Sequence, residues 1–128
     1  HSWDPKGFIS GIDRIQIPCD EELNDKVRAA AGAVEGLACH QGIIATGDQF
    51  VGSKDKLNRL MEEFGAVACE MEGGSIGQVC YINKVPFTVV RAISDNANDD
   101  AHMDYPKFLK IAVKKSFELL TELMPLLA

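Results

Sequence analysis

Residues 37–69 read LACHQGIIATGDQFVGSKDKLNRLMEEFGAVAC, and this stretch decides the fold. It contains two short apolar runs, over residues 42–45 and 66–69, of the kind expected in buried parallel strands. Between them, Ser53 is placed to cap a helix and Gly65 to end it. The apolar residues of that helix follow helical spacing: Leu57, Leu60, Met61 and Phe64. The stretch therefore predicts a strand within residues 37–46, a helix, and a strand over residues 66–69.

Upstream of this unit, the sequence predicts one more strand and one more helix. A short β-like stretch over residues 12–17 is ended by Pro18. Asp20 can then cap a helix, and Gly36 supplies its stop signal. The apolar positions of this helix again follow helical spacing: Leu23, Val27, Ala30, Ala31 and Val34.

Downstream, the sequence predicts a helix over residues 72–83 and then the strand with the strongest β-propensity in the chain. That strand, residues 86–93, reads PFTVVRAI. A polar loop over residues 94–103 follows, and Asp104 caps a last helix with Pro106 in its first turn. Apolar residues give this helix one apolar face: Phe108, Ile111, Ala112, Phe117, Leu120, Leu123 and Met124.

Strands and helices thus alternate along the whole sequence. Alternation of this kind predicts the α/β class, as a three-layer α/β/α sandwich with a mostly parallel sheet covered by helices on both faces. No internal repeat or linker interrupts residues 1–128, so we expect one folding unit.

Composition excludes several kinds of partner. The formal net charge is −6, and the lysines and arginines are scattered rather than gathered in a basic patch, so we expect no nucleic acid. No apolar run approaches the roughly 18 residues that a membrane span requires, so we expect no membrane. The four cysteines, Cys19, Cys39, Cys69 and Cys80, show neither a C-x-x-C pair nor zinc spacing, which favours a reduced, cytoplasmic compartment.

The candidate site follows from the predicted sheet, because ligands of open α/β sheets bind beyond the carboxyl ends of the strands. Those ends deliver residues 47–51 (GDQFV), residues 70–72 (EME), and Ser94 with Asp95. An aromatic ring, several carboxylates and a hydroxyl suit a neutral ligand with a flat base and a polyhydroxylated ring. Taken singly, Phe50 is equally a core residue, and Glu70 and Glu72 are equally carboxylates at a helix start, where the helix dipole favours them.

The sequence does not support a dinucleotide-binding motif, a calcium loop or a Ser–His–Asp triad. Residues 72–77 (EGGSIG) open a helix after a strand, but a carboxylate at Glu72 would repel the pyrophosphate of a dinucleotide. Residues 95–100 lack the glycine and the terminal glutamate of a calcium loop. No Ser–His–Asp set is recognisable with His1, His40 and His102 alone. We therefore expect neither a metal nor another cofactor.

The strand-end segments resemble the nucleosidases that cleave 5'-methylthioadenosine and S-adenosylhomocysteine, within the nucleoside phosphorylase and nucleosidase superfamily. The matching pieces are residues 46–50 (TGDQF), 68–73 (ACEMEG) and 89–95 (VVRAISD), with the helix start from His102 to Phe108. The resemblance runs from about Ile9 to the C-terminus and implies a homodimer. It also implies that the chain is the C-terminal half of a nucleosidase domain.

The resemblance implies a role for each matching residue. Asp95 would be the general acid at adenine N7, with Ser94 supporting it. Phe50 would stack on the purine while the Val51 backbone pairs with its edge. Glu72, in the segment that also holds Glu70, would accept hydrogen bonds from the 2'- and 3'-hydroxyls of the ribose. Met71 would pack beneath the ribose, and Tyr105 would line the end of the pocket that holds the 5'-thio group.

The chemistry agrees with those roles. Breaking an N-glycosidic bond leaves positive charge on the sugar and negative charge on the base, so a positioned acid at N7 accelerates departure by about 10²–10⁴-fold. Asp95 must then hold a proton near neutral pH, which a dry or carboxylate-rich pocket provides. The carboxylate that activates water in this family lies in the half without a counterpart here, so we expect the isolated chain to be inactive and to expose apolar surface. A purine nucleoside phosphorylase and a non-catalytic nucleoside-binding or inert fragment stay open as alternatives.

Overall fold

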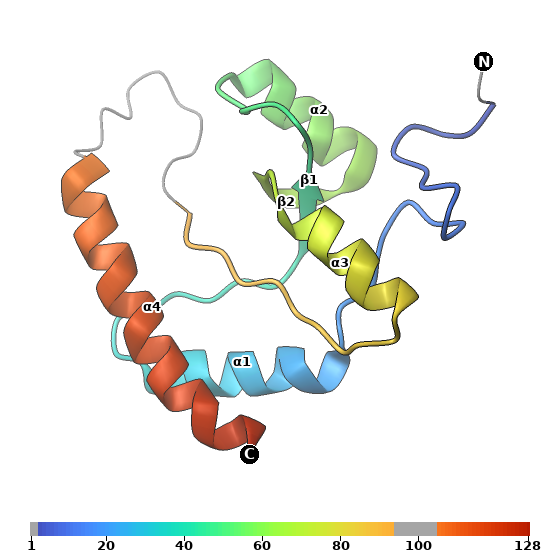
Figure 1. Cartoon of the computed structure of the whole chain (residues 1–128). Coiled ribbons are helices and arrows are strands. Elements are labelled where there is room, and N and C mark those ends of the chain that lie inside the picture. The colour runs from blue at the N-terminus through green and yellow to red at the C-terminus, as the bar shows by residue number, and fades with distance from the viewer. Residues whose placement is uncertain (1–2, 94–104) are drawn as a thin grey trace.

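The computed structural model describes residues 3–93 and 105–128. Its elements, in chain order, are α1 (Glu21–Ala33), β1 (Ile43–Thr46), α2 (Lys54–Phe64), β2 (Ala66–Glu70), α3 (Gly73–Ile82) and α4 (Tyr105–Leu127). Helices combined with a parallel strand pair confirm the α/β class (Figure 1).

The β1–α2–β2 unit forms as the sequence predicts. β1 and β2 pair in parallel, with Ala45 opposite Cys69 and Thr46 opposite Glu70. The Ser53 hydroxyl accepts from the Lys56 N–H at 3.4 Å and caps α2. Gly65 ends α2 with a φ of 65°, a left-handed conformation that glycine adopts without steric cost. Local capping signals therefore set both ends of the helix that joins the strands.

Helix α3 packs against the end of β1. The Gly74 N–H donates to Thr46 Oγ1 at 2.8 Å. A Cβ on Gly74 would lie only 2.8 Å from the Thr46 Cβ. Because the absent side chain is what lets helix and strand approach so closely, the glycine-rich start of α3 positions this helix on the strand pair.

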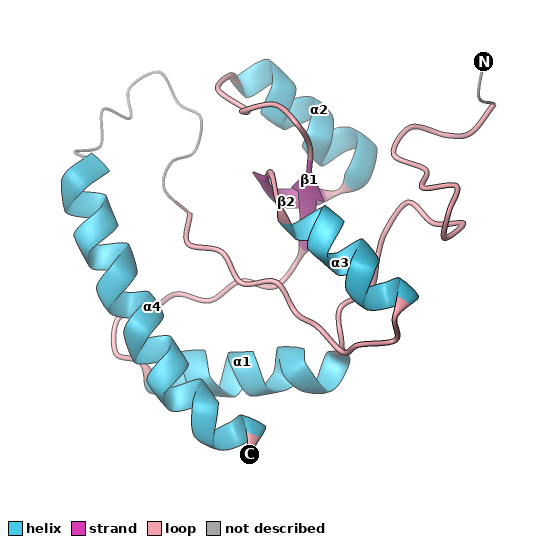
Figure 2. Cartoon of the chain, viewed as in Figure 1, coloured by secondary structure: helices cyan, strands magenta, loops and turns pink. Residues whose placement is uncertain are grey.

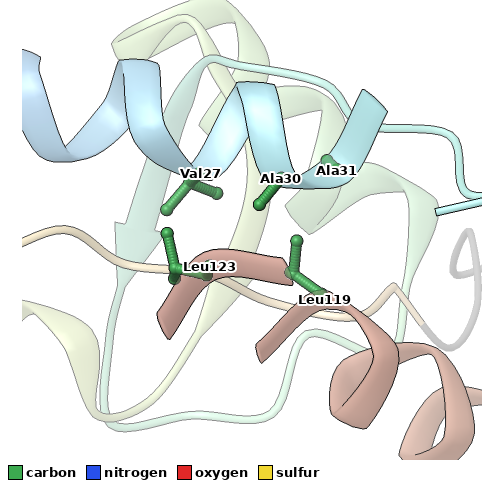
Figure 3. Close-up of a cluster of buried hydrophobic side chains, with 5 residues drawn as sticks. All are labelled: Val27, Ala30, Ala31, Leu119 and Leu123. Atoms are coloured by element: carbon green, nitrogen blue, oxygen red, sulfur yellow. The ribbon is translucent and has the colours of Figure 1, made fainter. Parts of the chain in front are cut away.

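Helices α1 and α4 cross and enclose the largest buried cluster in the described residues (Figure 3). Asp20 caps α1 by accepting from the Leu23 N–H at 2.9 Å, as predicted. The cluster joins α1 to the C-terminal half of α4 through Val27, Ala30, Ala31, Leu119 and Leu123. Lys115 of α4 also donates to the main-chain oxygen of Glu35, just beyond α1. Apolar packing and one polar contact therefore join α1 to α4, the last helix of the chain.

Two predicted strands are wrong. Residues 12–17 form turns and an isolated antiparallel bridge between Ile9 and Arg14, and residues 86–93 are an extended loop (Figure 2). The loop is tied to α1 instead of to a strand, since the Asp20 N–H donates to the Phe87 oxygen at 2.8 Å and Thr88 donates to Asn24. Both sequences have β-propensity, but a strand requires a neighbour, and within residues 3–93 and 105–128 the only ladder is β1–β2.

The apolar face predicted for α4 is also only partly right. Leu119 and Leu123 are buried, but Phe117 is 72% exposed and Met124 is 62% exposed. Helix α3 likewise presents Ile76, Val79 and Ile82 to solvent. The fold thus leaves much apolar surface uncovered. None of the helices in the described part of the chain combines the length and apolarity that a membrane span needs.

Candidate active site

The carboxyl ends of β1 and β2 lie side by side and form the candidate site. The ladder ends at the Thr46–Glu70 pair, and the Gly47 N–H extends it by donating to the Glu70 oxygen at 3.1 Å. The loop that carries Phe50 and Val51 therefore leaves the sheet beside the segment that carries Met71 and Glu72. This is the juxtaposition that parallel strands predict.

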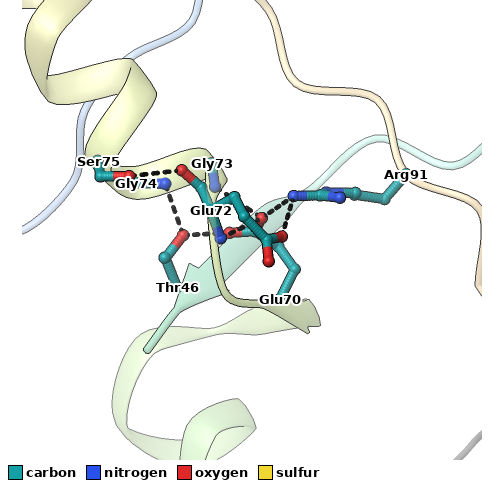
Figure 4. Close-up of polar contacts among 7 residues, drawn as sticks. All are labelled: Thr46, Glu70, Glu72, Gly73, Gly74, Ser75 and Arg91. Carbon is teal, nitrogen blue, oxygen red and sulfur yellow. Dashed lines mark hydrogen bonds and ion pairs between the residues drawn. The ribbon is translucent and has the colours of Figure 1, made fainter. Parts of the chain in front are cut away.

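Glu70 is the most heavily bonded side chain at this edge (Figure 4). Its carboxylate accepts from the Glu72 N–H at 3.0 Å and from the Gly73 N–H at 2.6 Å, both at the start of α3. It also accepts from the Thr46 hydroxyl and from Arg91. With only 8% of its side chain exposed, Glu70 joins β1, β2, α3 and the 86–93 loop.

These hydrogen bonds hold Glu70 ionised. Burial alone acts to raise the pKa of this carboxyl, but the donors from Thr46, Gly73, Glu72 and Arg91 outweigh it and lower the pKa from 4.5 to about 2. On Arg91, burial acts in the opposite direction, and the two carboxylates raise the pKa of the guanidinium above its ordinary value. Both groups are therefore fully charged near neutral pH.

Arg91 bridges Glu70 and Glu72. One guanidinium nitrogen, Nη2, contacts Glu70 Oε2 and lies 2.7 Å from Glu72 Oε2 (Figure 4). The Glu72 side chain is 62% exposed, in contrast to that of Glu70. Glu72 is thus the carboxylate of this pair that faces solvent and remains accessible to a ligand.

The other residues predicted for the site are placed as follows. Phe50 is 75% exposed and Met71 is 47% exposed, while Val51 is half-buried. Tyr105 is the first residue of α4. Ser94 and Asp95 lie outside the described residues, as does His102. The structure therefore places Glu70, Met71 and Glu72 at the carboxyl end of β2, and Phe50 and Val51 in the loop that follows the carboxyl end of β1.

The sequence did not predict two residues of the site, Thr46 and Arg91. Thr46 donates to Glu70 and accepts from the Gly74 N–H, and Arg91 forms ion pairs with both Glu70 and Glu72. Each carried a signal. Thr46 directly follows the apolar run over residues 42–45, and Arg91 is the one charged residue within residues 86–93.

The edge is open rather than enclosed. Two cavities of about 810 and 700 Å³ occur elsewhere, one lined by residues of 5–16 with Glu63 and Phe64, the other by residues of 11–20 and 81–87. Neither contains a residue of the candidate site. Among the described residues, no cluster of three or more His, Cys, Asp or Glu side chains could hold a metal ion.

Comparison with known proteins decides the family. The sequence profile of the phosphorylase superfamily matches residues 6–125. The chain belongs to the phosphorylase superfamily. Within this superfamily, the chain is 39% identical over 120 residues to the aminodeoxyfutalosine nucleosidase of Helicobacter pylori, covering 94% of this chain and 51% of that protein. It is 37% identical to the 5'-methylthioadenosine/S-adenosylhomocysteine nucleosidase of Glaesserella parasuis, covering 94% and 48%.

Solved structures of the phosphorylase superfamily share the fold. One is an aspartate-to-asparagine mutant of the Helicobacter pylori methylthioadenosine nucleosidase, with 5'-methylthioadenosine in the active site. It superposes with a TM-score of 0.74 at 38% identity, covering 85% of this chain and 47% of that one. The chain therefore spans about half the length of the relatives it matches.

Proposed function

We propose that this chain supplies the base- and sugar-binding part of a nucleosidase that hydrolyses the N-glycosidic bond of 5'-methylthioadenosine and S-adenosylhomocysteine, releasing adenine. The supporting observation is that the carboxyl ends of β1 and β2 lie side by side, with an exposed aromatic ring, Phe50, in the loop after β1 and an exposed carboxylate, Glu72, just after β2. The names of the relatives in the superfamily agree with this chemistry.

In this proposal, each residue of the edge has a role that suits its exposure. Phe50, three-quarters exposed, stacks on the purine, and the Val51 backbone pairs with its edge. Met71 packs beneath the ribose. Glu72 accepts hydrogen bonds from the 2'- and 3'-hydroxyls, and these bonds strengthen as the sugar becomes cationic. Tyr105 lines the end of the pocket that holds the 5' group.

Asp95 is proposed as the general acid and Ser94 as its support. Protonation or a strong hydrogen bond at adenine N7 makes the base a better leaving group, because it removes the negative charge that would develop there. One relative has been solved as an aspartate-to-asparagine mutant with 5'-methylthioadenosine in its active site.

The attacking water requires a base that we place outside residues 1–128, since the chain spans about half the length of its relatives. The chain alone is therefore proposed to be inactive or nearly so. The proposal also includes a homodimer and a cytoplasmic location, the latter supported by four cysteines with neither a C-x-x-C pair nor zinc spacing, as expected in a reducing compartment.

Adenine release from 5'-methylthioadenosine tests the function. The assay compares the chain with a fusion that adds the N-terminal half of the Glaesserella parasuis relative, each with and without phosphate. We expect release by the fusion alone, independent of phosphate. Release that requires phosphate would assign the chain to the phosphorylases instead, and a folded fusion that releases no adenine contradicts the proposal.

A further inference from the structure

Two carboxylates contact Arg91, those of Glu70 and Glu72, and they differ in how many of their oxygens are free to bind a ligand. Glu70 is 8% exposed, and its oxygens already accept from Thr46, Arg91 and two main-chain N–H groups. It has little capacity left for a ligand. Glu72 accepts from Arg91 through Oε2, and Oε1 makes no hydrogen bond to residues 3–93 or 105–128. Glu72 therefore keeps one carboxylate oxygen available.

An exposed glutamate at the start of a helix is ordinarily mobile, and an exposed ion pair holds such a side chain weakly because both partners must be ordered together. Arg91 differs from an ordinary exposed arginine. Its guanidinium is fixed by the nearly buried Glu70, which is itself fixed by the first N–H groups of α3. The partner that Glu72 meets is thus already ordered, and so is the main chain from which Glu72 projects.

We propose that Glu70 and Arg91 are positioning residues for sugar binding. Glu70 fixes Arg91 and the start of α3, and Arg91 holds one oxygen of Glu72 so that the other faces the nucleoside hydroxyls. This inference rests on the proposed function, in which Glu72 is the sugar ligand. Thr46 belongs to the same hydrogen-bond network, because its hydroxyl donates to Glu70 and accepts from the Gly74 N–H.

The test separates sugar positioning from general support of the fold. Affinity of the 128-residue chain is measured by titration calorimetry for adenosine and for 2',3'-dideoxyadenosine, which differ only in the hydroxyls assigned to Glu72. We expect Glu70→Gln and Arg91→Ala each to weaken adenosine binding about tenfold, as loss of a charge-assisted contact does, and to change dideoxyadenosine binding less than about twofold. Arg91→Lys keeps the charge and should recover part of the loss.

Matched controls come from α2. Glu62→Gln and Arg59→Ala change exposed residues of the same types and should leave both affinities unchanged. In the Arg91→Ala background, Glu70→Gln should weaken adenosine binding by less than it does in the wild-type chain, since part of its effect passes through Arg91 and only the part that passes through the start of α3 remains. Equal losses for both nucleosides, or no loss, would overturn the inference.

A ligand-free measurement distinguishes this inference from the function on which it rests. In the wild-type chain, the side-chain N–H groups of Arg91 should give sharp NMR signals and exchange slowly with water. In Glu70→Gln, these signals should broaden or the N–H groups should exchange faster. Unchanged signals overturn the inference even where adenosine is preferred. Wild-type chain that binds neither nucleoside, or both equally, contradicts the proposed role of Glu72, and the Arg91 signals then decide whether Glu70 orders Arg91.

Discussion

Glu70 and Glu72 have the same side chain and opposite environments. Glu70 is the last residue of β2 and its carboxylate points into the junction with α3, whereas Glu72, the N-cap position of that helix, lies two residues beyond the strand and its side chain is largely exposed. Sequence alone predicted both as ligand carboxylates. Only the fold shows that Glu70 is occupied by the chain's own donors, because its hydrogen bonds come from three separate segments.

The stability that Glu70 contributes should depend on pH. Its pKa is lowered in the folded state, so the contribution is fully present above the unfolded value near 4.5 and is lost as pH falls towards about 2. Glu70→Gln should lower the free energy of unfolding by about 1–3 kcal/mol at pH 7, because the pKa of the carboxyl is about 2 in the folded chain against 4.5 ordinarily and solvent screens part of this difference. Urea unfolding followed by circular dichroism at pH 7, 4 and 3 should show the difference from wild type shrinking below pH 4.5.

The control for this measurement is Glu62→Gln, an exposed carboxylate on α2. It should differ little from wild type at any pH. A difference between Glu70→Gln and wild type that stays constant from pH 7 to pH 3 would show that the charge of Glu70 contributes nothing to stability.

Asp95→Asn should separate binding from turnover in the chain fused to a complementary N-terminal half. An amide cannot donate the carboxyl proton to N7, so adenine release should fall by about 10²–10⁴-fold. Affinity for 5'-methylthioadenosine, measured by calorimetry, should change little. Binding and turnover that disappear together would contradict the acid role.

At the scale of elements, the sequence predicted helices better than strands. The caps at Asp20 and Ser53 and the stop at Gly65 act within a few residues, and each forms as expected. A strand depends on a distant neighbour, so the PFTVVRAI segment, the strongest strand by propensity, lies against α1 as a loop. The contact of Arg91 with both glutamates was unpredictable for the same reason, since it depends on where this loop runs.

The approach of α3 to β1 should depend on a missing side chain. Gly74→Ala places a Cβ 2.8 Å from the Thr46 Cβ, which forces helix and strand apart. We expect a loss of about 1–3 kcal/mol in the free energy of unfolding. Urea unfolding provides the measurement.

Gly32→Ala in α1 is the matched control. A Cβ there meets nothing within 4 Å, so alanine should stabilise the helix by about 0.5–1 kcal/mol through its higher propensity. If Gly74→Ala stabilises the chain as Gly32→Ala does, the close packing of α3 on Thr46 is contradicted.

At the scale of the whole molecule, buried and exposed apolar surfaces lie on different faces of α4. Leu119 and Leu123 pack on α1. A second stripe, with each member more than half exposed, follows helical spacing: Val113, Phe117, Leu120 and Met124. Contiguous exposed apolar surface of this kind marks an interaction site or a cause of association.

We therefore expect the chain to self-associate through this stripe. Sedimentation velocity should show an average sedimentation coefficient that rises with protein concentration, and Phe117→Glu should reduce the rise. Glu122→Gln, an exposed change on another face of the same helix, is the control and should leave association unchanged. Monomeric sedimentation of the wild-type chain at every concentration would contradict the expectation.

The pairing of α1 with α4 has a consequence for biosynthesis. Helix α1 packs against α4, which is the last helix of the chain. During synthesis on the ribosome, the apolar face of α1, formed by Val27, Ala30 and Ala31, therefore stays uncovered until α4 has been made. At typical synthesis rates this delay is on the order of 5–20 seconds, long compared with the time in which β1, α2 and β2 can assemble locally. Helix α1 is thus accessible to nascent-chain chaperones for longer than the β1–α2–β2 unit.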